Sequence, residues 1–144
     1  MNRRRIEMAA IAMTALALAG CSAGVAPASS LLDNEQTAED RVEVATVFDT
    51  SGFDPETTRL VGQHDDVSFY FVINAEGESG EKECLLAVPA SEQDWLGLCN
   101  GGGEGSGAGI GVGSFRYGFG GVASAGLTED EVAVGDYVIV VVDG

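Results

Sequence analysis

The chain reads ECLLAVPASEQDWLGLC from Glu83 to Cys99, and this stretch decides the fold. Two apolar runs flank a polar loop that contains proline, which is the pattern of a β-hairpin. If Leu86 pairs with Gly97, Cys84 lies directly opposite Cys99 on one face, within reach of a cross-strand disulfide. A bridge across a loop of this length stabilises a fold by about 3 kcal/mol in the chain-entropy model. We therefore predict a disulfide-linked hairpin with apolar side chains on both faces.

The flanking sequence predicts further strands. Residues 57–62 are rich in β-branched side chains, residues 67–74 alternate, and the polar run QHDD at 63–66 turns the chain between them. The run YVIVVV at 137–142 is apolar on both faces, which is typical of a strand near the middle of a sheet. This run and the 83–99 hairpin must cover each other in one small domain. We predict a mostly β fold, namely a small antiparallel β-sandwich or partly open barrel with one disulfide.

The segment before these strands admits two interpretations. Thr37–Asp40 has a helix-start pattern, an N-cap residue followed by acids, with Val42 and Ala45 on the apolar face of the helix that follows. Residues 41–47 also alternate polar and apolar side chains, as a strand would. We favour the helix, so the predicted fold includes one short N-terminal helix.

Residues 100–113 are glycine-rich, with glycine at every odd position from 101 through 113. In a strand this period of two would line one face with glycines, and an aromatic ring or another backbone could approach it closely. The alternative is a low-complexity loop, because glycine loses the most entropy on ordering. We favour a loop up to about Ala108 and a strand after it, through Phe119.

The N-terminus has the three regions of a secretory signal peptide. A basic start, Arg3–Arg5, precedes an apolar run over residues 8–20 that is shorter than the roughly 20 residues needed to span a bilayer. The run ends in Leu18-Ala19-Gly20-Cys21, which resembles the lipobox of bacterial lipoproteins. The resemblance implies that the peptide is cut before Cys21 and that this cysteine carries a thioether-linked diacylglycerol.

This interpretation divides the chain into three parts. We predict a signal peptide over 1–20, a lipidated N-terminus and flexible tether over 21–36, and a single β-rich domain over 37–144. The expected location is the cell membrane, lipid-anchored on the extracytoplasmic face. Exported proteins fold where disulfides persist, which agrees with the two cysteines that remain besides Cys21.

The charge of the chain limits its partners. The full chain has a formal net charge of −16, and residues 1–20 hold three arginines and one glutamate, so the mature part carries −18. Phosphate backbones repel such a protein, and we predict no nucleic-acid partner. We expect contact with the membrane only through the lipid on Cys21, and a protein partner in the cell envelope remains open.

Few residues offer chemistry. His64 is the only histidine and stands beside Asp65 and Asp66, where it could act as a general base or a metal ligand. A lone histidine beside turn acids is more often a solvated turn residue. The segment Gly77-Glu78-Ser79-Gly80-Glu81 lacks the second glycine of a nucleophile elbow, and the glycine tract matches neither a dinucleotide fingerprint nor a complete calcium repeat. We predict no catalytic residue, no cofactor and no metal site.

Three segments together resemble a known group of proteins: Thr58–Asp65, Cys84–Val88, and Trp95–Cys99 before the glycine-rich stretch. They are similar to small, functionally unassigned lipoproteins of high-GC Gram-positive bacteria, over roughly residues 50–144. The resemblance implies a compact β-rich domain with one bridge and transfers no active site.

The expected function is therefore that of a membrane-anchored extracytoplasmic lipoprotein with a non-enzymatic binding or accessory module. The alternative is a hydrolase or metal-dependent enzyme that uses His64 and nearby carboxylates. A pocket converging on His64 and two carboxylates would favour the enzyme, and a flat exposed apolar patch would favour a partner surface.

Overall fold

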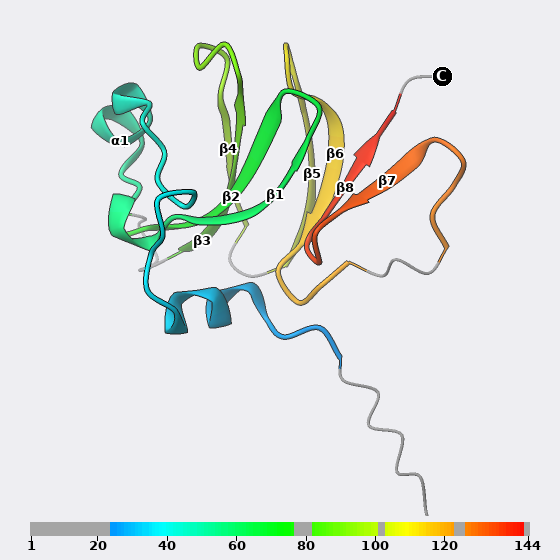
Figure 1. Ribbon diagram of the computed structural model, residues 1–144, viewed down its shortest axis with the longest axis horizontal. Coiled ribbons are helices and arrows are strands. Elements are labelled where there is room, and N and C mark those ends of the chain that lie inside the picture. The colour runs from blue at the N-terminus through cyan, green and yellow to red at the C-terminus, as the bar shows by residue number, and fades with distance from the viewer. Residues whose placement is uncertain (1–23, 77–81, 101–102, 123–125, 143–144) are drawn as a thin grey trace, which may run out of the picture.

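Two four-stranded antiparallel sheets face each other in the computed structural model, which describes residues 24–76, 82–100, 103–122 and 126–142 (Figure 1). The first sheet has the order β1-β2-β3-β4, with β1 Arg59–His64, β2 Val67–Asn74, β3 Lys82–Pro89 and β4 Leu96–Cys99. The second has the order β5-β6-β8-β7, with β5 Glu104–Gly109, β6 Gly113–Gly118, β7 Glu131–Val134 and β8 Val138–Val141. The sheets do not close into one barrel, and the predicted mostly β fold is confirmed.

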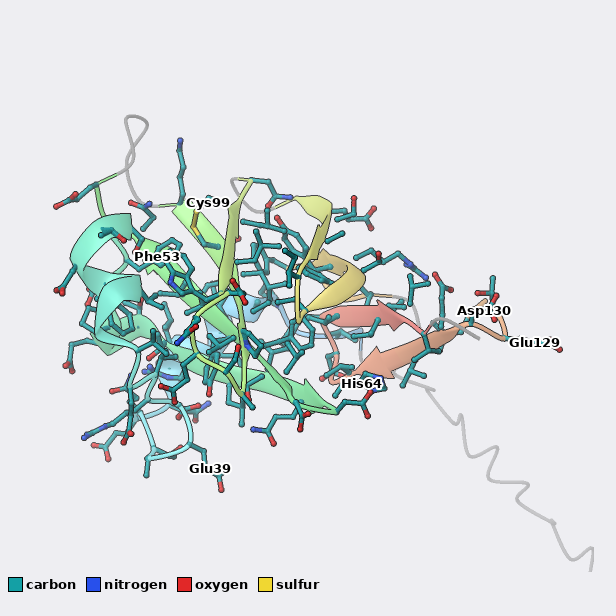
Figure 2. The ribbon with its side chains drawn as sticks, turned by 90° about the horizontal axis from the view of Figure 1, so that it is seen from above. Glu39, Phe53, His64, Cys99, Glu129 and Asp130 are labelled. Atoms are coloured by element: carbon teal, nitrogen blue, oxygen red, sulfur yellow. A yellow bond between two sulfur atoms is a disulfide. The ribbon has the colours of Figure 1, made fainter. Side chains whose placement is uncertain are left out.

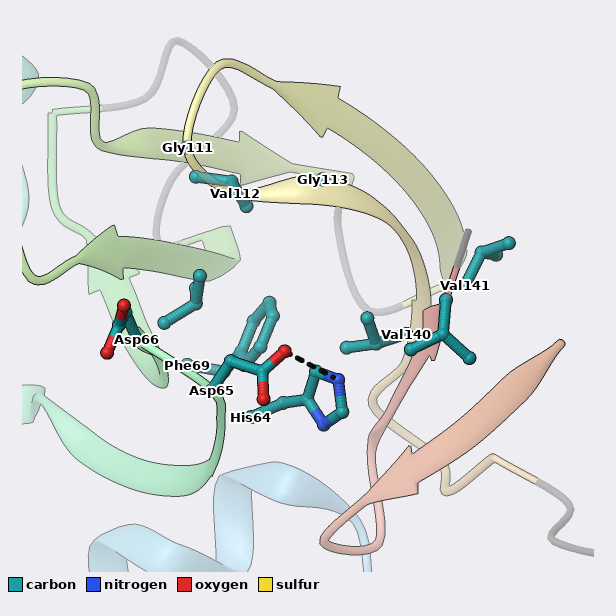
Figure 3. A pocket seen from close by; sticks show the side chains of 11 residues that line it. His64, Asp65, Asp66, Phe69, Gly111, Val112, Gly113, Val140 and Val141 are labelled. Carbon is teal, nitrogen blue, oxygen red and sulfur yellow. Dashed lines mark ion pairs between the residues drawn. The ribbon is translucent and has the colours of Figure 1, made fainter. Parts of the chain in front are cut away.

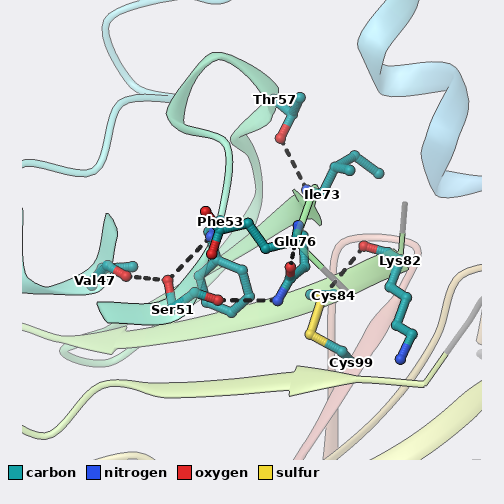
Figure 4. The surroundings of a disulfide bond; sticks show 10 residues. Val47, Ser51, Phe53, Thr57, Ile73, Glu76, Lys82, Cys84 and Cys99 are labelled. Carbon is teal, nitrogen blue, oxygen red and sulfur yellow. Dashed lines mark hydrogen bonds between the residues drawn. A yellow bond between two sulfur atoms is a disulfide. The ribbon is translucent and has the colours of Figure 1, made fainter. Parts of the chain in front are cut away.

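The 83–99 hairpin forms in the predicted register. Leu86 pairs with Gly97 and Cys84 with Cys99, whose Cα atoms lie 4.1 Å apart and whose sulfurs are bonded (Figure 4). The predicted disulfide is confirmed. Cys84 is fully buried while Cys99 is exposed, so the bond fastens the short strand β4 to the interior strand β3.

The main core lies between the two sheets and is built from alternate side chains. Phe69 meets Phe115 edge-on with ring centroids 5.3 Å apart, and Phe71 meets Phe119 in the same way at 5.4 Å. Buried aromatic pairs of this kind contribute about 0.5–1.5 kcal/mol beyond their area burial. These contacts fix the face-to-face packing of β2 against β6.

The first sheet is covered on its other face as well. Tyr70, Val72 and Leu86 point there and form a second cluster with Val47 and Phe53. Val47 belongs to helix α1, Ala45–Ser51, which covers this face in Figure 1. Both faces of β2 and β3 are therefore buried, which explains why the side chains on both faces are apolar.

The predicted central position of the last strand is confirmed. β8 lies between β6 and β7, and Val138 and Ile139 are fully buried. Consecutive residues of a strand point to opposite faces, so burial of both requires cover on each side of the sheet.

The glycine-rich stretch differs from the prediction. The loop expected up to Ala108 is strand β5 from Glu104, and the strand expected after it begins only at Gly113. A Cβ atom built on Gly105 would lie 2.7 Å from the Tyr117 ring, and one on Gly107 would lie 2.5 Å from Leu98 Cδ1. The glycines therefore let neighbouring side chains reach the backbone of β5, which orders a segment without large apolar side chains of its own.

The short N-terminal helix exists but begins later than the pattern indicated. The backbone N–H and hydroxyl of Thr37 both donate to the Asp40 carboxylate, which closes a turn instead of opening a helix. Helix α1 runs from Ala45 to Ser51 and is capped by Gly52, whose φ of 71° suits glycine. The strand alternative over residues 41–47 is wrong.

The predicted flexible tether over 21–36 is too long. Residues Ala28–Asp33 form a 3-10 helix, η1, in which Ala28 is fully buried and its N–H donates to Phe119 O at 2.7 Å. Leu31 and Leu32 pack against the main core. Small residues such as alanine and serine suggested a flexible tether, but in this segment they permit close packing against the core. The predicted signal peptide and Cys21 lie outside the described residues.

Candidate functional site

The two ends of the sandwich carry different parts of the chain. The N-terminal segment packs at one end, where the Tyr137 hydroxyl donates to Ala26 O at 2.8 Å beside the turn between β7 and β8. The β1–β2 turn, the β5–β6 turn and the end of β8 gather at the opposite end (Figure 1). A site at that second end is therefore remote from the N-terminus.

A cavity of about 350 Å³ opens between these three segments. We call it the His64 cavity; its lining residues are His64, Asp65, Asp66, Val67, Phe69, Gly111, Val112, Gly113, Val140, Val141 and Val142. It combines an apolar wall with a polar rim, as ligand sites of proteins commonly do.

The β1–β2 turn supplies the polar rim. His64 is the last residue of β1, and its Nε2 atom lies 3.4 Å from Asp65 Oδ2 (Figure 3). Nε2 is buried and makes no hydrogen bond within the described residues. Asp65 and Asp66 form the exposed tip of the hairpin, and Asp65 has a left-handed backbone with φ of 49°. Aspartate tolerates this conformation better than most residues.

Valines from separate segments form the apolar wall. Val67 opens β2, Val112 lies in the β5–β6 turn, and Val140 lies on β8; all three side chains are buried. Val141 is more open, with 38% of its surface exposed, and stands at the side of the cavity in Figure 3. These wall residues could not be identified from the sequence, since no local pattern links positions so far apart in the chain.

The structure places some of the predicted site residues together and leaves others undescribed. His64, Asp65 and Asp66 come together in one cavity, although His64 was predicted to be an ordinary turn residue. Cys84 and Cys99 come together as a structural bond. Cys21 lies outside the described residues, so its lipidation stays a prediction.

The lining limits the chemistry of the cavity. None of the described side chains that line it is a serine, threonine, cysteine or tyrosine, so they supply no hydroxyl or thiol nucleophile. Nor do the described residues contain a group of three histidine, cysteine, aspartate or glutamate side chains placed to hold a metal ion. The arrangement is suited to binding, or to a histidine that activates water.

A second cavity, of about 490 Å³, lies beneath helix η1 at the N-terminal end. Two of its polar side chains already have partners: the Asp54 carboxylate accepts from Glu56 N, and the Thr57 hydroxyl donates to Asp54 O and accepts from Ile73 N. Satisfied groups give a ligand less to gain, so we favour the His64 cavity as the functional site.

Across the part of the chain that the structure describes, no helix is long and apolar enough to cross a membrane. Comparison with known proteins finds no matching family model, no matching curated protein and no matching solved structure.

Proposed function

We propose that this protein is a lipoprotein anchored through Cys21 to the extracytoplasmic face of the cell membrane, and that its domain is a non-enzymatic binding module. The segment Leu18-Ala19-Gly20-Cys21 and the preceding basic and apolar regions support the anchor. The Cys84–Cys99 disulfide agrees with an oxidising compartment outside the cytoplasm. The resemblance to small lipoproteins of high-GC Gram-positive bacteria supports the same proposal.

One structural observation supports the binding role above all others. The N-terminal segment joins the sandwich at one end, through Ala26 and Ala28, and the His64 cavity opens at the other. A lipid on Cys21 would hold the first end toward the bilayer. The cavity would then face away from the membrane, where a ligand or an envelope partner can reach it.

The anchor is tested by the variant Cys21→Ala, expressed as the full chain in a Gram-positive host. The protein should lose its acyl mass and either leave the membrane fraction or accumulate as uncleaved precursor, because no thiol remains to receive the lipid. Ser22→Ala, one position further along, should be acylated and retained in the membrane. Normal acylation and membrane retention of Cys21→Ala would contradict the proposal.

A second candidate function is a hydrolase that uses His64 and nearby carboxylates. It is favoured by the placement of His64, Asp65 and Asp66 around one cavity, with Nε2 3.4 Å from Asp65 Oδ2 and not engaged in a hydrogen bond. Turnover of ester or amide substrates that His64→Gln abolishes would favour this enzyme over the binding module.

A further inference from the structure

The polar part of the His64 cavity is acidic. Asp65 and Asp66 are both exposed at its rim, and no lysine or arginine is among the described residues that line it. The rest of the protein reinforces this sign, since the chain has a formal net charge of −16. An anion would be repelled here, and a cation would be attracted by both carboxylates.

The remainder of the cavity favours hydrocarbon. Val67, Val112 and Val140 present buried side chains to it, and no polar side chain interrupts this wall among the described lining residues. Its volume of about 350 Å³ falls at the lower end of the range for small-molecule sites, which is about 300–1,000 Å³. These dimensions suit a compact ligand with a short apolar body.

His64 adds one directional contact. Its Nε2 atom is buried without a hydrogen bond, at the junction between the acidic rim and the valine wall. Asp65 Oδ2 lies 3.4 Å from this nitrogen without a hydrogen bond to it. Buried polar atoms normally have a hydrogen-bond partner, and an ammonium group placed beside Asp65 would give the nitrogen one. A neutral imidazole that carries its proton on Nδ1 accepts a hydrogen bond at Nε2, and an ammonium N–H donates one.

We infer that the His64 cavity binds a small primary alkylammonium ion. Its hydrocarbon body packs against Val67, Val112 and Val140, and its ammonium group lies against His64 Nε2 and the Asp65 carboxylate. Asp66 adds negative charge at the rim. This inference rests on the proposed binding function and deepens it, because it names the chemical class of the ligand.

The test is a titration of the full chain, reconstituted in nanodiscs of zwitterionic lipid, with empty nanodiscs as the blank. Hexylammonium should bind saturably and shift the amide resonances of residues 64–67, 111–113 and 140–142. Hexanoate, of the same length and opposite charge, should leave them unchanged. Hexyltrimethylammonium keeps the charge but has no N–H to donate, so it should bind more weakly than hexylammonium.

Matched variants separate the site from the overall charge. Asp65→Asn/Asp66→Asn should weaken hexylammonium binding by about three- to tenfold, the effect expected for two exposed carboxylates. Asparagine keeps the size of aspartate and tolerates the left-handed backbone at position 65. Glu39→Gln/Asp49→Asn removes the same charge from exposed positions elsewhere, with Glu39 well separated from His64 in Figure 2, and should change the affinity less than twofold.

Three results would overturn the inference: equal binding of hexanoate, resonance shifts confined to other residues, or equal losses of affinity in both double variants. Failure of the anchor is a separate result. A chain that carries no lipid would be recovered without membrane and titrated in buffer. Binding by that chain would refute only the anchor, while lack of binding by a lipidated chain would refute only the ligand.

Discussion

Gly105 is a residue at which the side chain of a buried aromatic residue occupies the place of a missing Cβ atom. Two ring carbons and the hydroxyl oxygen of Tyr117 lie 2.7 Å from the place where a Cβ would stand. Tyr117 is itself buried in the main core, next to Phe115 and Phe119, so its ring cannot move aside freely. The conformational cost of ordering this glycine is offset by the aromatic packing that it permits.

Replacement of this glycine should therefore reverse the usual effect of alanine in a strand. Gly105→Ala should lower the free energy of unfolding by about 1–3 kcal/mol through overpacking, although alanine ordinarily gains about 0.5–1 kcal/mol over glycine. Gly103→Ala is the control, since the nearest atom, Asn100 O, would lie 3.9 Å from its Cβ. Denaturant unfolding of both variants measures the difference. Equal stability of the two would show that Tyr117 yields easily.

Among the elements, the segment before α1 is held to β1 by one carboxylate. Asp40 accepts hydrogen bonds from Thr37 on one oxygen and from Leu60 N, at 2.8 Å, on the other. Burial alone would raise the pKa of Asp40, but these hydrogen bonds outweigh it, and the pKa is lowered from its ordinary value of 3.8. Asp40 thus joins the turn at residues 37–40 to the first strand of the sheet.

This junction makes the stability of the domain sensitive to acid. A carboxyl whose pKa is lowered on folding binds its proton less tightly in the folded state, so its contribution is present above pH 3.8 and is lost as the pH falls through the lowered pKa. Asp40→Asn should be less stable than the unmodified chain at pH 7. The gap should narrow below about pH 4. Thermal unfolding between pH 7 and pH 3 measures it, and a constant gap would contradict the assignment.

The elements also differ in how far the sequence could predict them. The hairpin register of β3 and β4 followed from two cysteines and from apolar residues on both faces, which leave one sensible pairing. Strand β5 could not be predicted, because its order comes from Tyr117 and Leu98 and not from its own glycines. Strand β7 has only four residues, of which Val132 and Ala133 are exposed, so it carries no clear alternation.

The candidate site illustrates the same limit. The position of His64 beside two acids was visible in the sequence, and a solvated turn was the ordinary interpretation. What makes it a site is a wall of valines at positions 67, 112 and 140, and these meet only once the two sheets pack. Contacts between distant segments leave no trace in local patterns, so neither the cavity nor its orientation could be predicted.

At the scale of the whole molecule, β8 holds the second sheet together. It pairs with β6 on one side and β7 on the other, and Val138 and Val140 face the main core. Strand β7 is joined to the rest of the second sheet only through β8, since β6 and β7 do not pair with each other.

Deletion of residues 138–144 should therefore unfold the domain rather than shorten it. Within the intact chain, Ile139→Ala should cost about 2–5 kcal/mol, because Ile139 is fully buried, whereas Val141→Ala, at 38% exposure, should cost much less. Calorimetry of the truncated chain and of both variants tests this. A truncated chain whose thermal transition stays within a few degrees would show that β8 is peripheral.

The hydrogen bond from Tyr137 to Ala26 ties the chain to the folded domain five residues after Cys21. If Cys21 carries the lipid, only about five residues separate the anchor from the folded body, a leash of at most roughly 18 Å. A linker this short keeps the domain close to its lipid anchor. The domain cannot reach targets far from the membrane, so its targets have to diffuse to it. The protein would then stay close to the membrane surface. It would diffuse laterally with the lipid while its cavity keeps a nearly constant height above the bilayer.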